Sequence, residues 1–504
     1  MAFLTFHITK LRGIAMRIVK KTQCHFGEVN IAEIDLSARS RDDIPAILKG
    51  LQYIYTTDEA KEKVFHALEK TLPSTVDSKT GRPGMELWTI FVLATLKLGL
   101  NCDFDRLQEL ANQHKTVRQM LGHSGWEDVT NYKLQTIIDN VSKLKPKILA
   151  DINQVIVEVG HEVVKKKPGD ALQTRCDSFV VETDVHYPTD INLLWDAMRK
   201  VIELTGRLSE QEKITDWRQY RFNLKQLKRL FRKAQKIKHS TSKDEEKKAA
   251  RCEEVHQTYL DYLAAAKQLI TKSQQTNKVI VNRNNLQAVE QIHHYIQHAE
   301  RQIDQIDRRV LKDEVIPHQE KVFSIFEEHT EWVKKGKAGV PVELGVRVCV
   351  LEDQHQFVLH HRIMWQETDD IVAVPMIEDA KTRFPQINQC SFDKGFHSKS
   401  NVIALNERLD NVILPKKGRR NKTEKTWEES EIFGQARRQH SAVEACINNL
   451  EIRGLDRCLS YGRDGFERHV ALSIVATNVH RIGFLLQRKA LVRLKRTEHR
   501  KKAA

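Results

Sequence analysis

The chain has 504 residues, more than one hydrophobic core usually contains, so two or three domains are expected. Hydrophobic residues make up 40% of it and charged residues 30%, which is typical of a soluble, folded protein. A net charge of +15 and an isoelectric point near 9.3 favour a polyanionic partner, with nucleic acid the best fit, although a basic protein without such a partner stays open.

Apolar runs and cysteines argue against two further classes of protein. No run approaches the roughly 20 residues of a membrane span, and the charged opening MAFLTFHITKLRGIAMRIVKK lacks a small-residue cleavage site for secretion. The eight cysteines are scattered, with no C-x-x-C pair, which argues for a reducing compartment and against a zinc module. Met16 is an alternative start to Met1, because the residues before it show no structural pattern.

The N-terminal third divides into an entry segment and a helical region. Residues 1–56 are predicted to be a partly unstructured entry, and residues 57–165 to be helical. Apolar residues recur at helical spacing in TTDEAKEKVFHALEKTL, MELWTIFVLATLKLGL, DFDRLQELANQH, KTVRQMLGH and NYKLQTIIDNVSKL. Short helices with interleaved Arg and Lys fit a helix-turn-helix reader of inverted repeats in DNA. They fit a plain helical bundle equally well.

Residues 191–335 are polar and predict a long helical insertion. Spacings of three and four alternate in a heptad seam of Val289, Ile292, Ile296, Ala299, Ile303, Ile306 and Val310. Such a seam indicates a coiled coil or a long helical hairpin, and it fits a dimer contact, an arm that spans DNA, or a hairpin folded on itself. His294 and His298 have the i, i+4 spacing of a zinc pair, but without a third ligand in view we expect solvated histidines.

The remaining segments predict an α/β core split by that insertion. The segment RCDSFVVE, within residues 170–190, reads as a first strand, and VRVCVLE with QFVLHHRIMW as a hairpin. Within residues 340–485 there follow the helix VPMIEDAKTRF, the strand INQCSF, the helix SKSNVIALNERL, the strand NVILP and the helix RRQHSAVEACINNLEI. This order is ribonuclease H-like (RNase H-like), with a mixed sheet flanked by helices. Residues 486–504 read as a basic C-terminal tail.

Three carboxylates take comparable places in this order. Asp177 lies in the first strand, Asp393 at the end of the fourth, and Glu444 on the last helix. On that helix His440, Glu444, Asn448 and Glu451 are expected on one polar face. Buried carboxylates need partners such as a metal or an arginine. Two Mg²⁺ (or Mn²⁺) ions held by such oxygens would serve phosphodiester cleavage, because they activate water and stabilise the leaving oxygen.

Other acids compete for these places. Asp184 is the alternative to Asp177 as first acid, and Asp190 suits a helix N-cap. Asp393 followed by Lys and Gly would also serve as an ordinary turn. Residues Lys416, Lys417, Arg419, Arg420, Lys422 and Lys425 form a basic loop beside the proposed site. That loop either neutralises DNA phosphates or is simply solvated.

The blocks CDSFVVETDVHYPTDINLLWDA, FDKGFHS and RRQHSAVEACINNLEIRGLDRC resemble those of insertion-sequence DDE transposases, and most closely the ISNCY-type group. The N-terminal TGRPGMELWTIFVLATLKLGLNCDFDRLQELANQH resembles that group as well. The resemblance implies an RNase H-like enzyme that cuts transposon ends and joins them to target DNA, using Mg²⁺. The three acids of the family fall at Asp177, Asp393 and Glu444 in these blocks, so the resemblance implies that these residues are catalytic and bind the metal.

The resemblance also implies partners and a location. Relatives often carry Arg and Lys where this chain has His440 and Glu451, so Arg438 and Arg453 are expected to replace them as DNA contacts, with Lys394 and the basic loop. The expected partner is double-stranded DNA, both the terminal inverted repeats and the target, with no membrane. The expected assembly is at least a homodimer in the synaptic complex, and the expected location is the bacterial cytoplasm, in association with the nucleoid. The alternatives are an inactive, transposase-derived DNA-binding protein and a coiled-coil scaffold.

Overall fold

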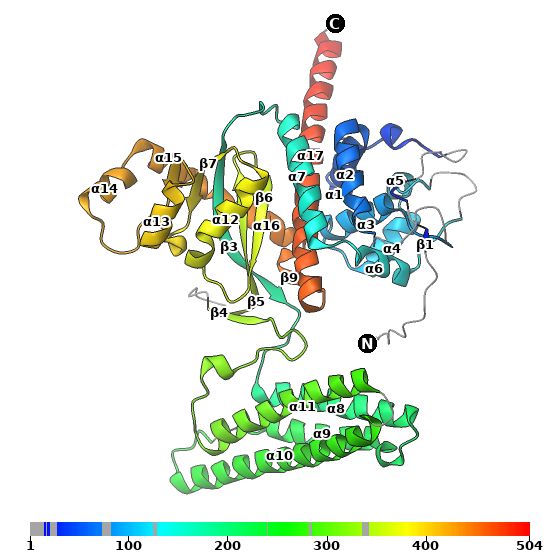
Figure 1. The fold of residues 1–504 in the computed structure, drawn as a ribbon, viewed down its shortest axis with the longest axis vertical. Helices are drawn as coiled ribbons and strands as arrows, with labels where there is room; N and C mark the ends of the chain where they lie inside the picture. Colours follow the sequence, from blue (N-terminus) through cyan, green and yellow to red (C-terminus); the bar gives the residue numbers. More distant parts are fainter. Residues whose placement is uncertain are drawn as a thin grey trace. The chain divides into compact units, whose positions relative to one another are not determined.

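The structure is a computed structural model that describes residues 15–16, 18–20, 28–72, 82–123, 129–238, 240–281, 285–334 and 342–503. The chain forms two compact units, which are described separately. The first unit contains residues 1–184 and 345–504, and the second contains residues 185–344 between them (Figure 1). A short parallel pair, β1 (Ala15–Met16) with β2 (Arg82–Pro83), stands apart from the main sheet of the first unit.

The main sheet is mixed and open, with the order β4-β5-β3-β7-β8, and β6 also pairs with β5. Strands β3, β5 and β6 are antiparallel neighbours, whereas β7 and β8 run parallel to β3. The short β9 continues along the end of β3. The strands are β3 (Leu172–Thr183), β4 (Glu331–Lys334), β5 (Val342–Asp353), β6 (Val358–Met364), β7 (Ile387–Phe392), β8 (Asn411–Ile413) and β9 (Arg457–Cys458). The predicted mixed sheet flanked by helices, in the predicted chain order, is confirmed.

Helices cover both faces of this sheet. On one face α12 packs against β6 and against a core that includes Cys390 and Phe392. On the other face Phe179, Val348 and their neighbours meet Cys446 and Leu450 of α16 and residues of α17. The helices after the hairpin are α12 (Asp369–Arg383), α13 (Lys399–Asn406), α14 (Lys422–Glu428), α15 (Glu431–His440), α16 (Ala442–Leu450) and α17 (Gly462–Ala503).

Two local predictions in this region are wrong. The helix expected over residues 437–452 is two helices, because α15 ends at His440 and α16 begins at Ala442. The basic loop is helical from Lys422 onward, since Asn421 caps α14 in a reciprocal capping box with Glu424. Ser441 between the two helices keeps helical backbone angles, φ −56° and ψ −20°.

The N-terminal helices share their core with the sheet. They are α1 (Asp43–Thr56), α2 (Asp58–Glu69), α3 (Leu87–Gly99), α4 (Phe104–Gln113), α5 (Lys115–Met120), α6 (Leu134–Val141) and α7 (Pro146–Val163). The helical expectation for residues 57–165 is confirmed, and every residue of α3 is buried. The entry segment is more ordered than expected, because α1 lies within it and packs on α17.

Helix α17 is the element that the sequence-based prediction missed. It packs against α1, α3 and α7 and continues through the segment expected to be a tail (Figure 1). Among the described residues it is the one helix whose apolar window, with a mean hydropathy of 1.3, is long enough to cross a membrane. That window is 72% buried inside the protein, and a buried core helix passes the same test.

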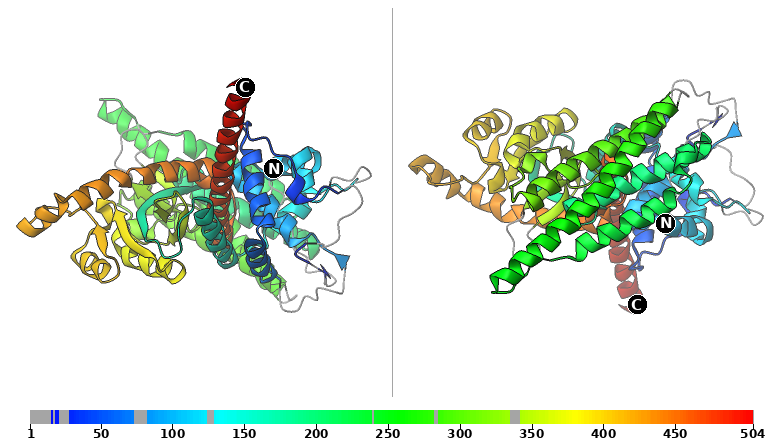
Figure 2. Two further views of the ribbon diagram at one scale, coloured as in Figure 1. Left: turned by 90° about the horizontal axis from the view of Figure 1, so that it is seen from above. Right: turned by 90° about the horizontal axis from the view of Figure 1, so that it is seen from below.

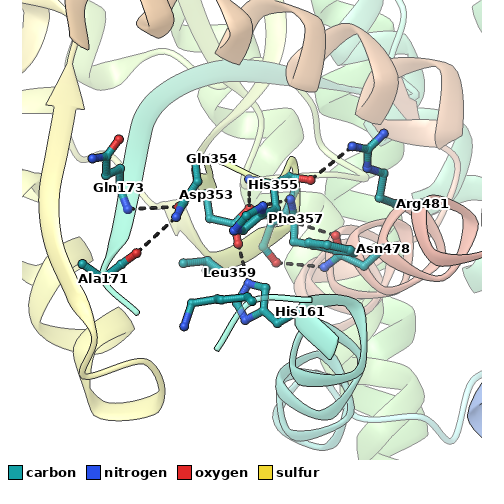
Figure 3. Close-up of polar contacts among 12 residues, drawn as sticks. His161, Ala171, Gln173, Asp353, Gln354, His355, Phe357, Leu359, Asn478 and Arg481 are labelled. Atoms are coloured by element: carbon teal, nitrogen blue, oxygen red, sulfur yellow. Dashed lines mark hydrogen bonds and ion pairs between the residues drawn. The ribbon is translucent and has the colours of Figure 1, made fainter. Parts of the chain in front are cut away.

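A polar network fastens the β5–β6 hairpin to α7 and α17 (Figure 3). The fully buried Asp353 accepts hydrogen bonds from the backbone amides of His355 and Phe357, and its second oxygen accepts one from His161 of α7. On α17, Asn478 donates to the Val358 carbonyl over 2.9 Å and accepts from the Val358 amide over 3.0 Å. Because these partners come from three elements, the hairpin and both helices are held in one arrangement.

The second unit is a bundle of four helices with its own core: α8 (Asp190–Gln211), α9 (Tyr220–Lys236), α10 (Glu245–Val281) and α11 (Leu286–Ile306) (Figure 2). The seam residues Ile292, Ile296 and Ile303 are buried against α8, α9 and α10. This matches the prediction of a hairpin folded on itself, because the seam is occupied within the chain. Helix α11 ends at Ile306 and is followed by a π-helical turn, Asp307–Leu311, so this helical stretch stops short of the expected 335. Strand β4 (Glu331–Lys334) lies in the following segment.

Candidate functional site

Asp177 lies in the middle of β3, at the centre of the sheet. It is opposite Val350 of β5, and the preceding Cys176 is opposite Phe392, the last residue of β7. One Asp177 carboxylate oxygen accepts a hydrogen bond of 2.8 Å from the Ser178 amide. The pKa of Asp177 is raised to about 6, chiefly by burial and then by the negative charges of Asp393, Asp369 and Glu444, although the Ser178 amide lowers it. These four acids therefore lie within electrostatic reach of one another.

Asp393 is placed beside Asp177 by the parallel pairing of β3 and β7. It directly follows β7 and begins a short 3₁₀ turn, Lys394–Phe396. Arg437 of α15 donates to the Asp393 carboxylate over 3.2 Å and to the Phe392 carbonyl over 3.1 Å. Burial would raise the pKa of Asp393, but the Lys394 amide and Arg437 hold it below its usual value. Asp393 is thus ionised and oriented by an arginine.

Glu444 reaches the same place from a helix. It lies in the first turn of α16, which packs against β3, and its side chain is exposed. Val443, Cys446 and Leu450 form the buried face of that helix. The exposed side chain of Glu444 agrees with its predicted place on a polar face. His440 differs from expectation: it is buried at the end of α15 and shares a hydrogen bond of 3.0 Å with Ser391 Oγ.

Asp369 is a fourth acid that sequence reasoning missed. It is the first residue of α12, and its carboxylate accepts a hydrogen bond of 2.6 Å from Ser178 Oγ. Its other oxygen lies close to Gly395, where an added Cβ would approach it to 2.9 Å. An acid in the first turn of a helix is ordinarily explained by the helix dipole, so the sequence carries no signal of its proximity to Asp177.

Asp184 lies too far along β3 to belong to this group. Seven residues of extended strand separate it from Asp177, roughly 23 Å at 3.3 Å per residue. Its nearest cationic partner is Arg457, at 4.0 Å. It is absent from the charges that shift the pKa of Asp177. If the acids around Asp393 and Glu444 form a site, the acid from the first strand is Asp177.

The expected arginine contacts are only partly where the sequence suggested. Arg453 is 4% exposed, bonds to His480 Nδ1 over 2.9 Å and donates to the Gly99 carbonyl, so it is a buried structural residue and not a DNA contact. Arg438 is exposed, and within the described residues no hydrogen bond or ion pair joins it to these acids. The arginine that reaches the acids is its neighbour Arg437.

The basic loop lies next to the turn that follows Asp393. Lys417 Nζ donates to the Gly395 carbonyl over 3.2 Å, and Lys394 is exposed in that turn. Within the described part of the chain, Lys416 and Arg420 pair with Glu424 and Glu428. Lys417, Arg419 and Lys422 have no such acidic partner among the described residues. These three therefore carry the excess positive charge of the loop.

The acids around Asp177 are suited to a hard divalent cation, although their oxygens are not among the close groups of ligand atoms in the described residues. Carboxylate oxygens are the ligands that Mg²⁺ prefers, and a bound cation would offset both the burial and the neighbouring negative charges that raise the pKa of Asp177. Among the described residues, the group of three whose ligand atoms lie within 4.8 Å of one another is His294, His298 and Glu328, in the second unit.

No family model matches the chain, and the comparisons with curated proteins and with solved structures find no similar protein.

Proposed function

We propose that this chain is a DDE-type DNA transposase, which cleaves DNA at transposon ends and joins the freed 3′-hydroxyl to target DNA. The observation that carries the proposal is the electrostatic effect of Asp393 and Glu444 on Asp177. Asp177 comes from a strand, Asp393 from a strand end and Glu444 from a helix, across 267 positions of the sequence (444 − 177). A largely buried carboxylate such as Asp177 usually has a charged partner, and a bound cation would provide one.

The strand order supports an RNase H-like core. Counted along the chain as one to five, strands β3, β5, β6, β7 and β8 are arranged 3-2-1-4-5. The first three are antiparallel, and the last two are parallel to the first. In an RNase H-like core the acids belong on the central first strand and on the end of its parallel neighbour, which is where Asp177 and Asp393 are found. The second unit interrupts this core between its first and second strands.

The roles of the residues follow from their contacts. Asp177, Asp393 and Glu444 would hold two Mg²⁺ (or Mn²⁺) ions, which when bound activate the attacking oxygen and stabilise the leaving oxygen of a phosphodiester. Arg437 orients Asp393 through its hydrogen bond and its backbone contact. Ser178 holds Asp369 beside Asp177. Water attacks at the transposon end first, and the resulting 3′-hydroxyl then attacks target DNA.

Double-stranded DNA is the proposed partner. Lys394 and the free cations of the basic loop lie beside the turn that carries Asp393, so a phosphate backbone near the acids would meet positive charge. Such contacts position DNA without reading its sequence. Two transposon ends must be held together, so the working complex would be a dimer or larger.

The test is cleavage of labelled DNA that carries the element's own terminal repeats, in Mg²⁺ and in Ca²⁺. Wild type and Asp184→Asn are expected to nick the repeat end in Mg²⁺, and Asp177→Asn, Asp393→Asn and Glu444→Gln to bind but not cut. Asp184→Asn is a matched control because it is the same change on the same strand. Specific binding without cleavage in either metal would instead support an inactive, transposase-derived DNA-binding protein.

A further inference from the structure

A cluster of side chains that can bind a metal lies in the helical unit, and the proposed cleavage reaction does not involve it. His294 and His298 are one turn apart on α11, and Glu328 comes from the segment that follows the bundle. His298 is 6% exposed, whereas the side chains of His294 and Glu328 are 47% and 51% exposed. The cluster therefore has one wall in the protein interior and one side open to solvent.

The three side chains converge on one point. The Nε2 atoms of His294 and His298 lie 2.9 Å and 2.8 Å from the same oxygen, Glu328 Oε1. The two rings are nearly perpendicular, at 84°, with centroids 4.8 Å apart. One ligand atom from each of the three residues lies within 4.8 Å of the other two, close enough for one ion to contact all three.

The segment that supplies Glu328 is held by its own contacts. Ser324 Oγ accepts hydrogen bonds from the amides of Phe326 and Glu327, and Thr330 Oγ1 donates to the Glu327 carbonyl over 2.7 Å. The ring of Phe326 lies 6.3 Å from that of Tyr295 on α11. The carboxylate is thus presented to the histidines by a fixed turn and not by a free chain, which lowers the entropy lost on binding a ligand.

The donor set selects a class of ligand. Two imidazoles and one carboxylate are the ligands of open zinc sites, in which water takes the fourth position. Hard cations such as Mg²⁺ prefer all-oxygen sites, which separates this cluster from the acids around Asp177.

We propose that His294, His298 and Glu328 bind one divalent transition-metal ion, Zn²⁺ by ligand type, with the fourth position open to water. The ion clamps the segment after α11 onto that helix, and so stabilises the helical unit. The site is independent of the proposed transposase activity, because its residues lie in the other unit of the chain.

The experiment uses the full chain, stripped with a chelator and titrated with Co²⁺ as a spectroscopic substitute for Zn²⁺. We expect the visible bands of a four-coordinate Co²⁺ ion at one ion per chain, and their loss when Zn²⁺ is added. Glu328→Gln and His298→Asn should lose the bands. His293→Asn, a change at the exposed neighbouring histidine, and Asp177→Asn should keep them.

Thermal unfolding provides the second measurement. Zn²⁺ should raise the melting temperature of wild type and of His293→Asn but not of Glu328→Gln, which keeps an oxygen to accept from the histidines and should fold without metal. Absence of Co²⁺ bands in folded wild type, or bands that persist at full strength in Glu328→Gln and His298→Asn, would overturn the proposal. Loss of the bands in Asp177→Asn would indicate that the ion binds at the acids of the sheet, and would also overturn the proposal.

Discussion

Replacing Asp177 by Asn is expected to stabilise the metal-free protein at neutral and alkaline pH. The pKa of Asp177 is raised to about 6 from an ordinary 3.8, chiefly by burial and then by Asp393, Asp369 and Glu444. Each pKa unit corresponds to about 1.4 kcal/mol, so carrying this charge costs the folded state up to about 3 kcal/mol above pH 6. Asn keeps the oxygen that accepts from the Ser178 amide and removes the charge.

The sign of the pH dependence follows from proton binding. Between pH 3.8 and 6 the folded state holds a proton on Asp177 that the unfolded state has released, so wild-type stability falls as pH rises through this window. The gain from Asp177→Asn should therefore be near zero at pH 4 and reach its full size by pH 8.

Urea unfolding in EDTA at pH 4.5 and pH 8 measures this difference, with Asp184→Asn as the control. Asp184 is exposed on the same strand, so its replacement should leave stability within about 0.5 kcal/mol of wild type. An Asp177→Asn protein no more stable than wild type at pH 8, or equally stabilised at both pH values, would refute the electrostatic account of the site.

Three further substitutions test particular contacts. Arg437→Ala should lower cleavage by about a hundredfold, because Asp393 loses its orienting partner; Arg438→Ala should stay within a few-fold of wild type in the same assay. Arg453→Ala should lower the free energy of unfolding by about 2–4 kcal/mol in urea titrations, as a buried hydrogen-bonded arginine is lost, and should leave the salt dependence of DNA binding unchanged. His469 has its pKa lowered to about 4 by burial, so protonating it opposes folding as pH falls from 6.5 to 4. His469→Gln can still donate to the Gly454 carbonyl but cannot be protonated. From pH 7 to pH 5 the free energy of unfolding of wild type should therefore fall by about 2 kcal/mol more than that of His469→Gln, as measured in urea titrations.

The α/β order could be predicted because it rests on local signals. Period-two runs such as VRVCVLE and the turn residues between them mark the strands and the hairpin that the structure contains. The pairing of Asp177 with Asp393 followed from topology, since parallel neighbours bring one strand end beside the middle of the other. Once the strands were assigned, two of the three proposed acids were placed together.

The rest depended on contacts that no short window of sequence contains. Arg437 and Arg438 are adjacent, and only the packing of α15 decides which of them faces Asp393. Arg453 looks like a surface cation, yet α3 and α17 enclose it. Glu328 lies 30 residues after His298 (328 − 298), so the third member of that cluster appears only when the chain turns back onto α11. In each case tertiary packing, not local pattern, assigns the side chain its partner.

The central claim is that Asp177, Asp393 and Glu444 hold the metal that cleaves DNA, and cysteine rescue tests it most directly. Each acid is replaced by Cys in turn, and cleavage of the terminal-repeat DNA is measured in Mg²⁺ and in Mn²⁺. A thiolate binds Mn²⁺ better than Mg²⁺. The account predicts that the three variants fail in Mg²⁺ and recover cleavage in Mn²⁺. Variants that cut as well as wild type in Mg²⁺, or wild-type cleavage that persists without any divalent cation, would contradict it.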